Sequence, residues 1–404
     1  MGGVPSSLRV GIVCLHTDPY APPGSGDVGG MNVVVRHTCD ALARAGHRVE
    51  VITRWSDPAT AGREEIDGVV VHRLAVGPPR TVLKGENEAF MDDFGRELAL
   101  LGPMDLLHSH HWFSGIAALP VARSWGVPHL QSFHSIAAPE STDLSAGERP
   151  ESPGRLQGEA FLAQQSDGVL AVSRAEAMTA LERLGAPPER LTVVYPGVDS
   201  ALFHPAPETP GKRSSVLVAA RLEPLKGVDL AIRALALLPV ERRPLLRIAG
   251  GATADASFGP ELLELAAGLG LRDDVELLGP QSRTGLADLM RSSTMVMVPS
   301  HSETYGLVAL EAAASGVPVI ASATGGLVEA VRDGTTGLLV QGRRPQDWAA
   351  AVDRLLAEPE LRERLGRQGR EHAVARTWDS VGAVVARAYR GVVVGAGVSA
   401  VGRA

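Results

Sequence analysis

Two carboxylates stand close together in residues 300–311, which read S-H-S-E-T-Y-G-L-V-A-L-E. Glu303 is predicted to lie in a loop after an apolar strand, and Glu311 in a helix that begins after Gly306. The start of a helix presents backbone N–H groups and the positive end of the helix dipole, so Gly306 and Leu307 could bind phosphates. Carboxylates accept hydrogen bonds from sugar hydroxyls. The stretch therefore favours a nucleotide sugar as ligand.

A pair of cations occurs in residues 221–227, R-L-E-P-L-K-G, which follow another predicted strand. Arg221 stands at the end of that strand, and Lys226 precedes the next predicted helix. A departing nucleoside diphosphate develops negative charge, and cations fixed beside it lower the barrier to reaction. The pattern predicts that both side chains contact one diphosphate.

A glycine pattern of the form G-x-G-x-x-G covers residues 24–29. In a dinucleotide-binding fold this pattern follows a strand immediately, and an acidic residue for the ribose comes later. Here a proline-rich gap separates it from the strand, and the next strand ends V-I-T-R without an acidic residue. We expect no nicotinamide cofactor, but a loop whose end opens a helix, where the N–H of Gly30 could meet a diphosphate.

Histidines are clustered in residues 107–112, L-H-S-H-H-W. On a strand, His108 and His110 would share one face and His111 would point to the other. No further cysteine or acidic ligand stands near, and no D-x-D motif occurs, so no metal is predicted and none is required for the core chemistry. His134 follows a different predicted strand, at an edge where ligands bind.

Short apolar runs alternate with helical patterns along the whole chain. Repeated β-α-β order predicts parallel sheets that are covered on both faces and bind ligands at the carboxyl ends of their strands. The runs are Leu8–Leu15, Arg48–Thr53, Val69–Leu74, Leu106–His108, His129–Ser132, Val169–Val172 and Leu191–Val194, then Val216–Ala220, Leu245–Ala249, Val275–Leu278, Met295–Val298, Val317–Ala321 and Gly337–Val340.

A proline-rich polar stretch at residues 199–213 divides the two series. We therefore expect a first domain over residues 1–198, a linker over 199–213 and a second domain over 214–376. Residues 377–404 follow, and 378–389 read as an amphipathic helix.

The composition limits the class of protein. A chain of 404 residues with 45% hydrophobic residues supports two well-filled cores. The net charge of −7 disfavours nucleic acid as a partner, and no apolar run is long enough to span a membrane. Only Cys14 and Cys39 are cysteines, which fits a reducing cytoplasm. Just three of the 39 basic residues are lysines, a bias that favours a GC-rich genome such as that of an actinobacterium.

Four motifs carry a family resemblance: R-L-E-P-L-K-G, S-x-x-E-x-x-G-L-V-A-L-E, A-S-G-V-P-V-I-A and G-G-L-V-E-A-V. Together they resemble the retaining glycosyltransferases of family GT4, whose GT-B fold is α/β, with two doubly wound Rossmann-like domains facing across a cleft. The resemblance implies that Arg221 and Lys226 bind the donor diphosphate, Glu303 the transferred sugar and Glu311 the nucleotide ribose. It also implies that the first domain binds the acceptor and that the last helix crosses back to it.

Motifs of the first half narrow the resemblance: G-S-G-D-V-G-G-M-N-V, L-H-S-H and F-H-S. They resemble the branch of GT4 that glycosylates inositol phosphate at the start of mycothiol biosynthesis and, more distantly, sucrose-phosphate synthases. That branch implies an anionic acceptor and places His134 against the donor sugar. The residues implied at the acceptor are Asn32, Lys84, His111, Ser135 and Arg155; Ser135 replaces a threonine, and His111 replaces a tyrosine.

The sequence thus predicts a retaining glycosyltransferase that moves a sugar from a donor resembling UDP-N-acetylglucosamine to a small, polar, anionic acceptor such as inositol phosphate. No carboxylate stands in a nucleophile position, so the resemblance implies same-face attack, with an oxygen of the leaving diphosphate accepting the proton. Family members are often homodimers.

Two alternatives remain. His111 and the divergent segment 82–90 favour a GT4 enzyme recruited to specialised metabolism, such as an antibiotic sugar, with a GDP- or UDP-sugar and another acceptor. A non-catalytic sugar-binding protein is disfavoured, because the residues expected at the donor are all retained.

Overall fold

A computed structural model of the protein describes residues 7–21, 29–206, 213–251 and 257–401. The chain divides into two compact units. The first comprises residues 1–142, 148–196 and 378–404, and the second comprises residues 143–147 and 197–377. Most of the G-x-G-x-x-G pattern and part of the expected linker lie outside the described residues.

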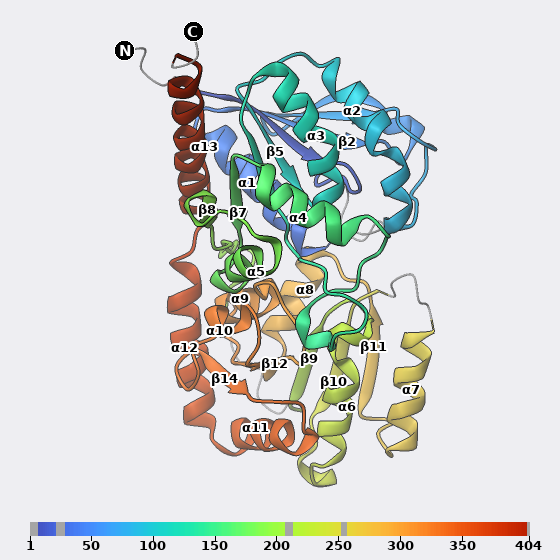
Figure 1. The fold of residues 1–404 in the computed structure, drawn as a ribbon. Coiled ribbons are helices and arrows are strands. Elements are labelled where there is room, and N and C mark those ends of the chain that lie inside the picture. The colour runs from blue at the N-terminus through green and yellow to red at the C-terminus, as the bar shows by residue number, and fades with distance from the viewer. Residues whose placement is uncertain (1–6, 22–28, 207–212, 252–256, 402–404) are drawn as a thin grey trace. The chain divides into compact units, whose positions relative to one another are not determined.

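The first unit is built on an eight-stranded sheet in the order β3-β4-β2-β1-β5-β6-β7-β8 (Figure 1). Its strands are β1 (Arg9–Cys14), β2 (Arg48–Arg54), β3 (Gly62–Ile66), β4 (Val69–Leu74), β5 (Leu106–His110), β6 (His129–Ser132), β7 (Gly168–Ala171) and β8 (Leu191–Val193). Its main helices are α1 (Gly30–Arg44), α2 (Met91–Ala99), α3 (Trp112–Trp125), α4 (Arg155–Gln165), α5 (Arg174–Leu184) and α13 (Trp378–Val401).

All neighbouring strands of this sheet are parallel except β3, which pairs antiparallel with β4. β3 was not predicted from the sequence, because its residues G-R-E-E-I carry three charges and no apolar run. Exposed edge strands of this kind are often charged, which prevents further strand pairing. β5 also runs two residues further than expected, to His110.

Alternation along β1 divides the first unit into two hydrophobic clusters. Val10 and Ile12 pack into a cluster that contains residues of α1 and α13. Val13 packs into the opposite cluster, which contains residues of α2, α3 and α4. The central strand is therefore buried on both faces, as expected for a doubly wound sheet.

The C-terminal helix α13 belongs to the first unit although it follows the second in sequence. Val381, Val385 and Tyr389 repeat every four residues and are buried in the cluster shared with α1. The Arg44 guanidinium on α1 pairs with the Asp379 carboxylate at 2.6 Å. The helical pattern recognised in the sequence ended at Tyr389, whereas the helix continues to Val401.

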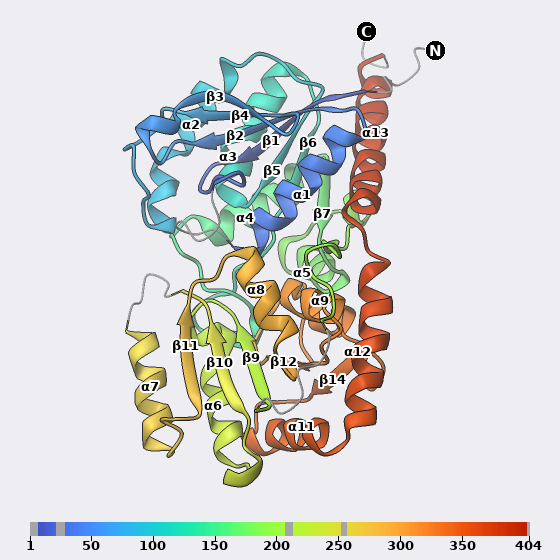
Figure 2. The same ribbon diagram turned by 180° about the vertical axis from the view of Figure 1, so that it is seen from behind.

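The second unit has a six-stranded sheet in the order β11-β10-β9-β12-β13-β14, and all its pairs are parallel (Figure 2). The strands are β9 (Ser215–Ala219), β10 (Leu245–Ala249), β11 (Val275–Gly279), β12 (Met295–Val298), β13 (Val319–Ser322) and β14 (Gly337–Val340). The helices are α6 (Val228–Ala236), α7 (Phe258–Gly268), α8 (Arg283–Arg291), α9 (Leu307–Ala314), α10 (Leu327–Ala330), α11 (Pro345–Ala357) and α12 (Pro359–Val374). This strand order is that of a Rossmann fold, so the predicted fold class is confirmed.

Within the described ranges, no helix is long and apolar enough to cross a membrane. Cys14 and Cys39 are both buried as free thiols.

Candidate active site

The charged residues predicted to bind the donor, Arg221, Lys226 and Glu303, lie at the topological switch point of the second unit. β9 and β12 are neighbours in the sheet, and the loops after them run to helices α6 and α9. Such a point is where doubly wound sheets bind ligands. The Lys226 Nζ lies 2.9 Å from Oε2 of Glu303, and the two side chains are 16% and 21% exposed. The Arg221 guanidinium lies 3.1 Å from Oε1 of Glu223.

Close backbone contacts hold these two loops together. The His301 N–H donates to the Leu225 carbonyl at 2.8 Å. Gly227 has a φ of +64°, and a Cβ there would lie 2.2 Å from the Pro299 carbonyl oxygen. Only glycine fits a position with both properties. Lys226 and Glu303 are therefore adjacent because their loops are in direct contact.

A third loop, which follows β13, contacts the backbone of Glu303. The N–H of Gly326 donates to the Glu303 carbonyl at 2.9 Å. A Cβ on Gly326 would lie 2.1 Å from the Thr304 carbonyl oxygen, so the glycine allows this close approach. The G-G-L motif at 325–327 thus fixes the backbone that carries the Glu303 carboxylate.

Glu311 lies one turn inside α9, beyond the helix start formed by Gly306 and Leu307. Its carboxylate is buried and accepts from Nη1 of Arg283 at 2.6 Å. Burial raises the pKa of Glu311, and the Arg283 charge opposes that rise. Arg283 was not predicted from the sequence, because a single arginine at the start of a helix forms no recognisable motif.

In the first unit, Arg155 lies at the centre of a buried charge network. Its guanidinium contacts three carboxylates, those of Glu148 at 3.4 Å, Glu151, and Glu159 at 2.8 Å. Its Nη2 also donates to Oγ of Ser135 at 3.0 Å. Together these carboxylates raise the pKa of Arg155 against the effect of burial.

Lys84 belongs to the same network, because its Nζ lies 3.3 Å from Oε1 of Glu148. The structure thus brings together Lys84, Ser135 and Arg155, which are far apart in sequence. It also adds Glu148 and Glu151, which the sequence analysis missed, since single carboxylates in a loop are common.

His111 lies beside this network and not on a strand. It precedes α3 with a φ of +69°, 2% exposed, and its Nε2 is 3.7 Å from Oε1 of Glu151. Its ring centroid is 4.4 Å from that of His16, which follows β1. His16 was missed in the sequence, although a polar residue just past a central strand is the kind of signal that could have identified it.

His134 is the end of a chain of polar side chains inside the first unit. Its Nε2 lies 2.7 Å from Nδ1 of His110. The ring centroids of His110 and His108, which share one face of β5, are 4.2 Å apart. Burial lowers the pKa of His134 to about 4, so the ring is neutral near pH 7. One of the two facing nitrogens therefore carries a hydrogen and donates a hydrogen bond to the other.

The protonation of His108 follows from its partners. Ser132 donates its hydroxyl proton to the Leu170 carbonyl at 2.8 Å, so its Oγ accepts from Nε2 of His108 at 3.0 Å. Burial lowers the pKa of His108, and the neutral ring then accepts at Nδ1 from the Tyr389 hydroxyl at 2.8 Å. A residue of α13 is thereby connected to the histidines that lead to His134.

Asn32 and Gly30 stand at the start of α1. The buried Asn32 amide donates to Thr17 Oγ1 at 2.8 Å and to the Asp18 carbonyl at 3.1 Å. It therefore holds the loop that follows His16, and its side-chain amide donates to that loop and not to the Arg155 network. Gly30 is exposed as the first residue of the helix.

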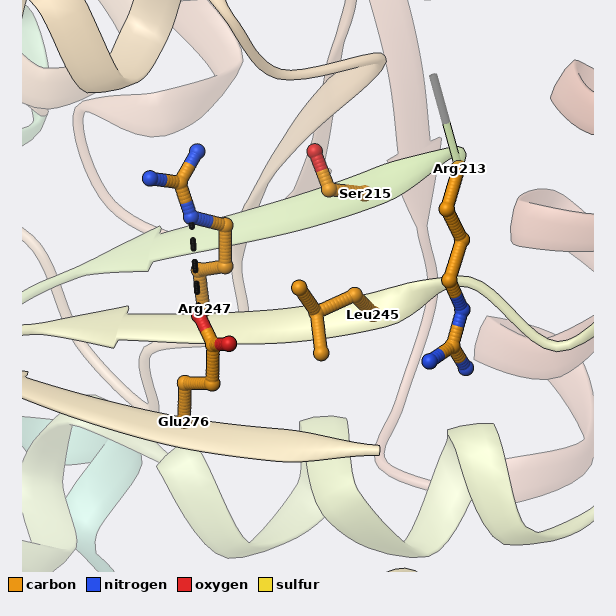
Figure 3. A pocket seen from close by; sticks show the side chains of 5 residues that line it. All are labelled: Arg213, Ser215, Leu245, Arg247 and Glu276. Carbon is orange, nitrogen blue, oxygen red and sulfur yellow. Dashed lines mark ion pairs between the residues drawn. The ribbon is translucent and has the colours of Figure 1, made fainter. Parts of the chain in front are cut away.

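No three metal-ligating side chains converge anywhere in the part of the chain that the structure describes. A hollow in the second unit is lined by residues at the beginnings of β9 to β11, where the Arg247 guanidinium pairs with Glu276 at 3.9 Å (Figure 3). It lies at the amino ends of these strands, whereas Arg221 and Lys226 follow the carboxyl end of β9. This hollow is therefore distinct from the candidate site.

Comparison with known proteins defines the class. Residues 28–202 match the model described as Glycosyltransferase Family 4, and residues 199–372 match Glycosyl transferases group 1. A sucrose-phosphate synthase from Thermosynechococcus elongatus has a similar structure, with a TM-score of 0.85, 29% identity and coverage of 95% of this chain and 98% of that one. Anabaena Alr3699/HepE, solved with UDP and glucose, shares the fold with a TM-score of 0.75 and 18% identity over 94% and 98% of the two chains.

Curated relatives are more similar in sequence. The D-inositol 3-phosphate glycosyltransferase of Kribbella flavida is 38% identical over 95% of both chains. That of Stackebrandtia nassauensis is 39% identical over 92% of this chain and 88% of the relative. The protein belongs to glycosyltransferase family 4 and has the GT-B fold, so the predicted family and enzyme class are confirmed.

Proposed function

We propose that the protein is a retaining glycosyltransferase that transfers a sugar from a nucleoside-diphosphate donor to an inositol phosphate. The proposed donor resembles UDP-N-acetylglucosamine. One observation carries the proposal. In a chain 38% identical to D-inositol 3-phosphate glycosyltransferases, Lys84, Arg155 and Ser135 converge in one network with His111 beside it.

The donor roles rest on the second unit. Arg221 and Lys226 would bind the diphosphate, together with the N–H groups of Gly306 and Leu307 at the start of α9. The Lys226–Glu303 ion pair supports this assignment, because a diphosphate would replace Glu303 as the partner of Lys226 and release the carboxylate for sugar hydroxyls. Glu311 would meet the ribose, which requires its pairing with Arg283 to rearrange.

The remaining roles belong to the first unit. Gly30 would present its N–H to the diphosphate, and the neutral His134 would lie against the transferred sugar. The acceptor hydroxyl would attack from the face that the diphosphate leaves, and a diphosphate oxygen would take its proton. The protein would contribute positioning and charge stabilisation.

A second candidate is an acceptor without a phosphate. Glu148 contacts both Lys84 and Arg155, and carboxylates placed in this way could accept from the hydroxyl or amino groups of a cyclitol. Such an acceptor would fit an enzyme of specialised metabolism.

Two measurements test the proposal. A thermal-shift panel of UDP, GDP and ADP should show selective stabilisation by one nucleotide, since a ligand that binds only the folded state raises its stability. The matching nucleotide sugar is then offered inositol 3-phosphate, free inositol and an aminocyclitol, and the anomeric configuration of the product is read by NMR. Retention with transfer to inositol phosphate is the expected result. Transfer only to free inositol or the aminocyclitol would replace the proposed inositol phosphate acceptor with the second candidate. Inversion of the anomeric configuration would contradict the retaining mechanism.

A further inference from the structure

His16 and His111 leave buried polar atoms without partners. Within the described ranges, both ring nitrogens of His111 lack a hydrogen-bond partner, and so does Nδ1 of His16. A buried polar atom without a partner costs about 1–3 kcal/mol, so such atoms are rare unless water or a ligand satisfies them. Three of them on two neighbouring rings, tilted by 47° and close to Lys84 and Arg155, indicate a binding site for a polar group.

The charges around these rings do not suit an anion as they stand. Lys84 and Arg155 supply two positive charges, whereas Glu148, Glu151 and Glu159 can supply three negative ones. A phosphate monoester adds close to two more negative charges near pH 7. Burying such an excess of one sign is unfavourable unless a proton is bound at the same time.

Building on the function proposed above, we propose that the paired rings of His16 and His111 take up a proton when the anionic group of the acceptor binds beside them. The two rings would donate to the phosphate oxygens, and a proton on either ring would offset part of the added charge. A protonated His111 would also pair with Glu151, whose Oε1 is already 3.7 Å away.

The charged groups that face these rings decide the sign of the effect. Burial and then the Lys84 charge lower the pKa of both histidines; Arg155 and His134 act in the same direction on each, and Glu148 opposes them at His16. Both rings are therefore neutral near pH 7 without a ligand, and an arriving anion raises their pKa. Acceptor affinity should fall as pH rises, by at most about tenfold per pH unit for one proton.

The test is isothermal titration calorimetry of the full chain between pH 7 and 8.5, where a phosphate monoester is almost fully ionised. Inositol 3-phosphate and inorganic phosphate are titrated separately, in the presence of the nucleoside diphosphate found by thermal shift. Comparing buffers with different ionisation enthalpies gives the number of protons taken up. The wild type should take up about one proton per bound anion.

Three variants identify where the proton goes. His111→Asn keeps a side chain that tolerates a positive φ but cannot be protonated, and His16→Gln is its counterpart. Each should reduce the proton uptake, and the double variant should abolish it and flatten the pH dependence of the acceptor KM. His204→Asn, which removes an exposed histidine of the second unit, is the matched control and should behave as wild type. Unchanged stabilisation by the nucleotide would show that each variant is folded.

The outcomes separate this inference from the proposed function. Proton uptake that persists in the double variant overturns the inference even if sugar transfer to inositol phosphate occurs, and would assign the proton to another titratable group near Arg155. If transfer fails but inorganic phosphate binds with histidine-dependent proton uptake, the inference stands and the proposed acceptor falls. If neither anion binds the wild type, both are wrong.

Discussion

The charged groups of the two units are held in different ways. In the second unit, Lys226 and Glu303 form a half-buried pair on two loops, and among the described residues each pairs with one group of opposite charge. In the first unit, Arg155 is fully buried and contacts three carboxylates from its own helix and the preceding loop. A ligand can replace Glu303 as the partner of Lys226 with little effect on the fold. The Arg155 network is buried inside the first unit, so we expect it to support the fold as well as the proposed binding of the acceptor.

Replacement of Arg155 should produce the largest change, because it would leave carboxylates in the first unit without their cation. Arg155→Met is expected to lower the free energy of unfolding by about 3–5 kcal/mol. Chemical denaturation with separate probes for the two units would measure it. Arg96→Met, which removes an exposed ion-paired arginine of the same unit, should have little effect. Equal stabilities for the two variants would mean that the Arg155 network does not support the fold.

Replacement of Lys226 should affect catalysis and leave stability nearly unchanged. Lys226→Ala is expected to reduce kcat about 10²–10³-fold, because it removes a cation that stabilises the leaving diphosphate. Steady-state kinetics with the identified donor gives the size of the loss, and a melting curve shows whether the fold persists. Arg233→Ala on the neighbouring helix α6 serves as the control. Near-normal turnover of the Lys226 variant would remove this residue from the donor site.

Acid should destabilise the first unit before the second. The pKa values of His108, His110 and His129 are lowered by burial, to about 3 for His129. Their contribution to the free energy of unfolding is fully present above the unfolded-state pKa near 6.5. It is lost as pH falls, by about 2 kcal/mol per histidine at pH 5. Burial raises the pKa of Glu176 to about 7 and also raises that of Glu159, and these two carboxyl groups act in the opposite direction.

Hydrogen–deuterium exchange at pH 7.5 and pH 5 would test this difference between the units. Peptides from β5 and β6 should lose protection at the lower pH, while those from β9 and β12 keep it. Uniform protection in both units would contradict the assignment of neutral histidines to the first unit.

The smallest effect is expected for Tyr389→Phe, which removes only the hydroxyl that donates to His108. The loss of one buried hydrogen bond costs about 1 kcal/mol. If the histidines position His134, kcat should also fall while the donor KM stays constant, and the pH profile should shift. A change in stability without any change in kcat would limit Tyr389 to a role in the fold.

The sequence predicted the second unit better than the first for a physical reason. Residues 221–227 and 300–311 are each continuous, and parallel strands bring their loops to one edge of the sheet. The network of the first unit collects single residues from separate loops and helices, and only a family resemblance could relate Lys84 to Arg155. His16, Glu148 and Glu151 lie in no motif at all, and β3 is too highly charged to resemble a strand.

The position of Tyr389 has a consequence for how the chain is made. A ribosome completes residues 1–196 and the whole second unit before it reaches α13, so the first sheet waits through the synthesis of an entire second domain with part of one face uncovered. During that interval His108 lacks the hydroxyl that its Nδ1 accepts from. The hydrogen bond that joins α13 to His108 therefore cannot form until that helix is made, whereas the bonds of His108 to Ser132 and of His110 to His134 need only the strands and loops already synthesised.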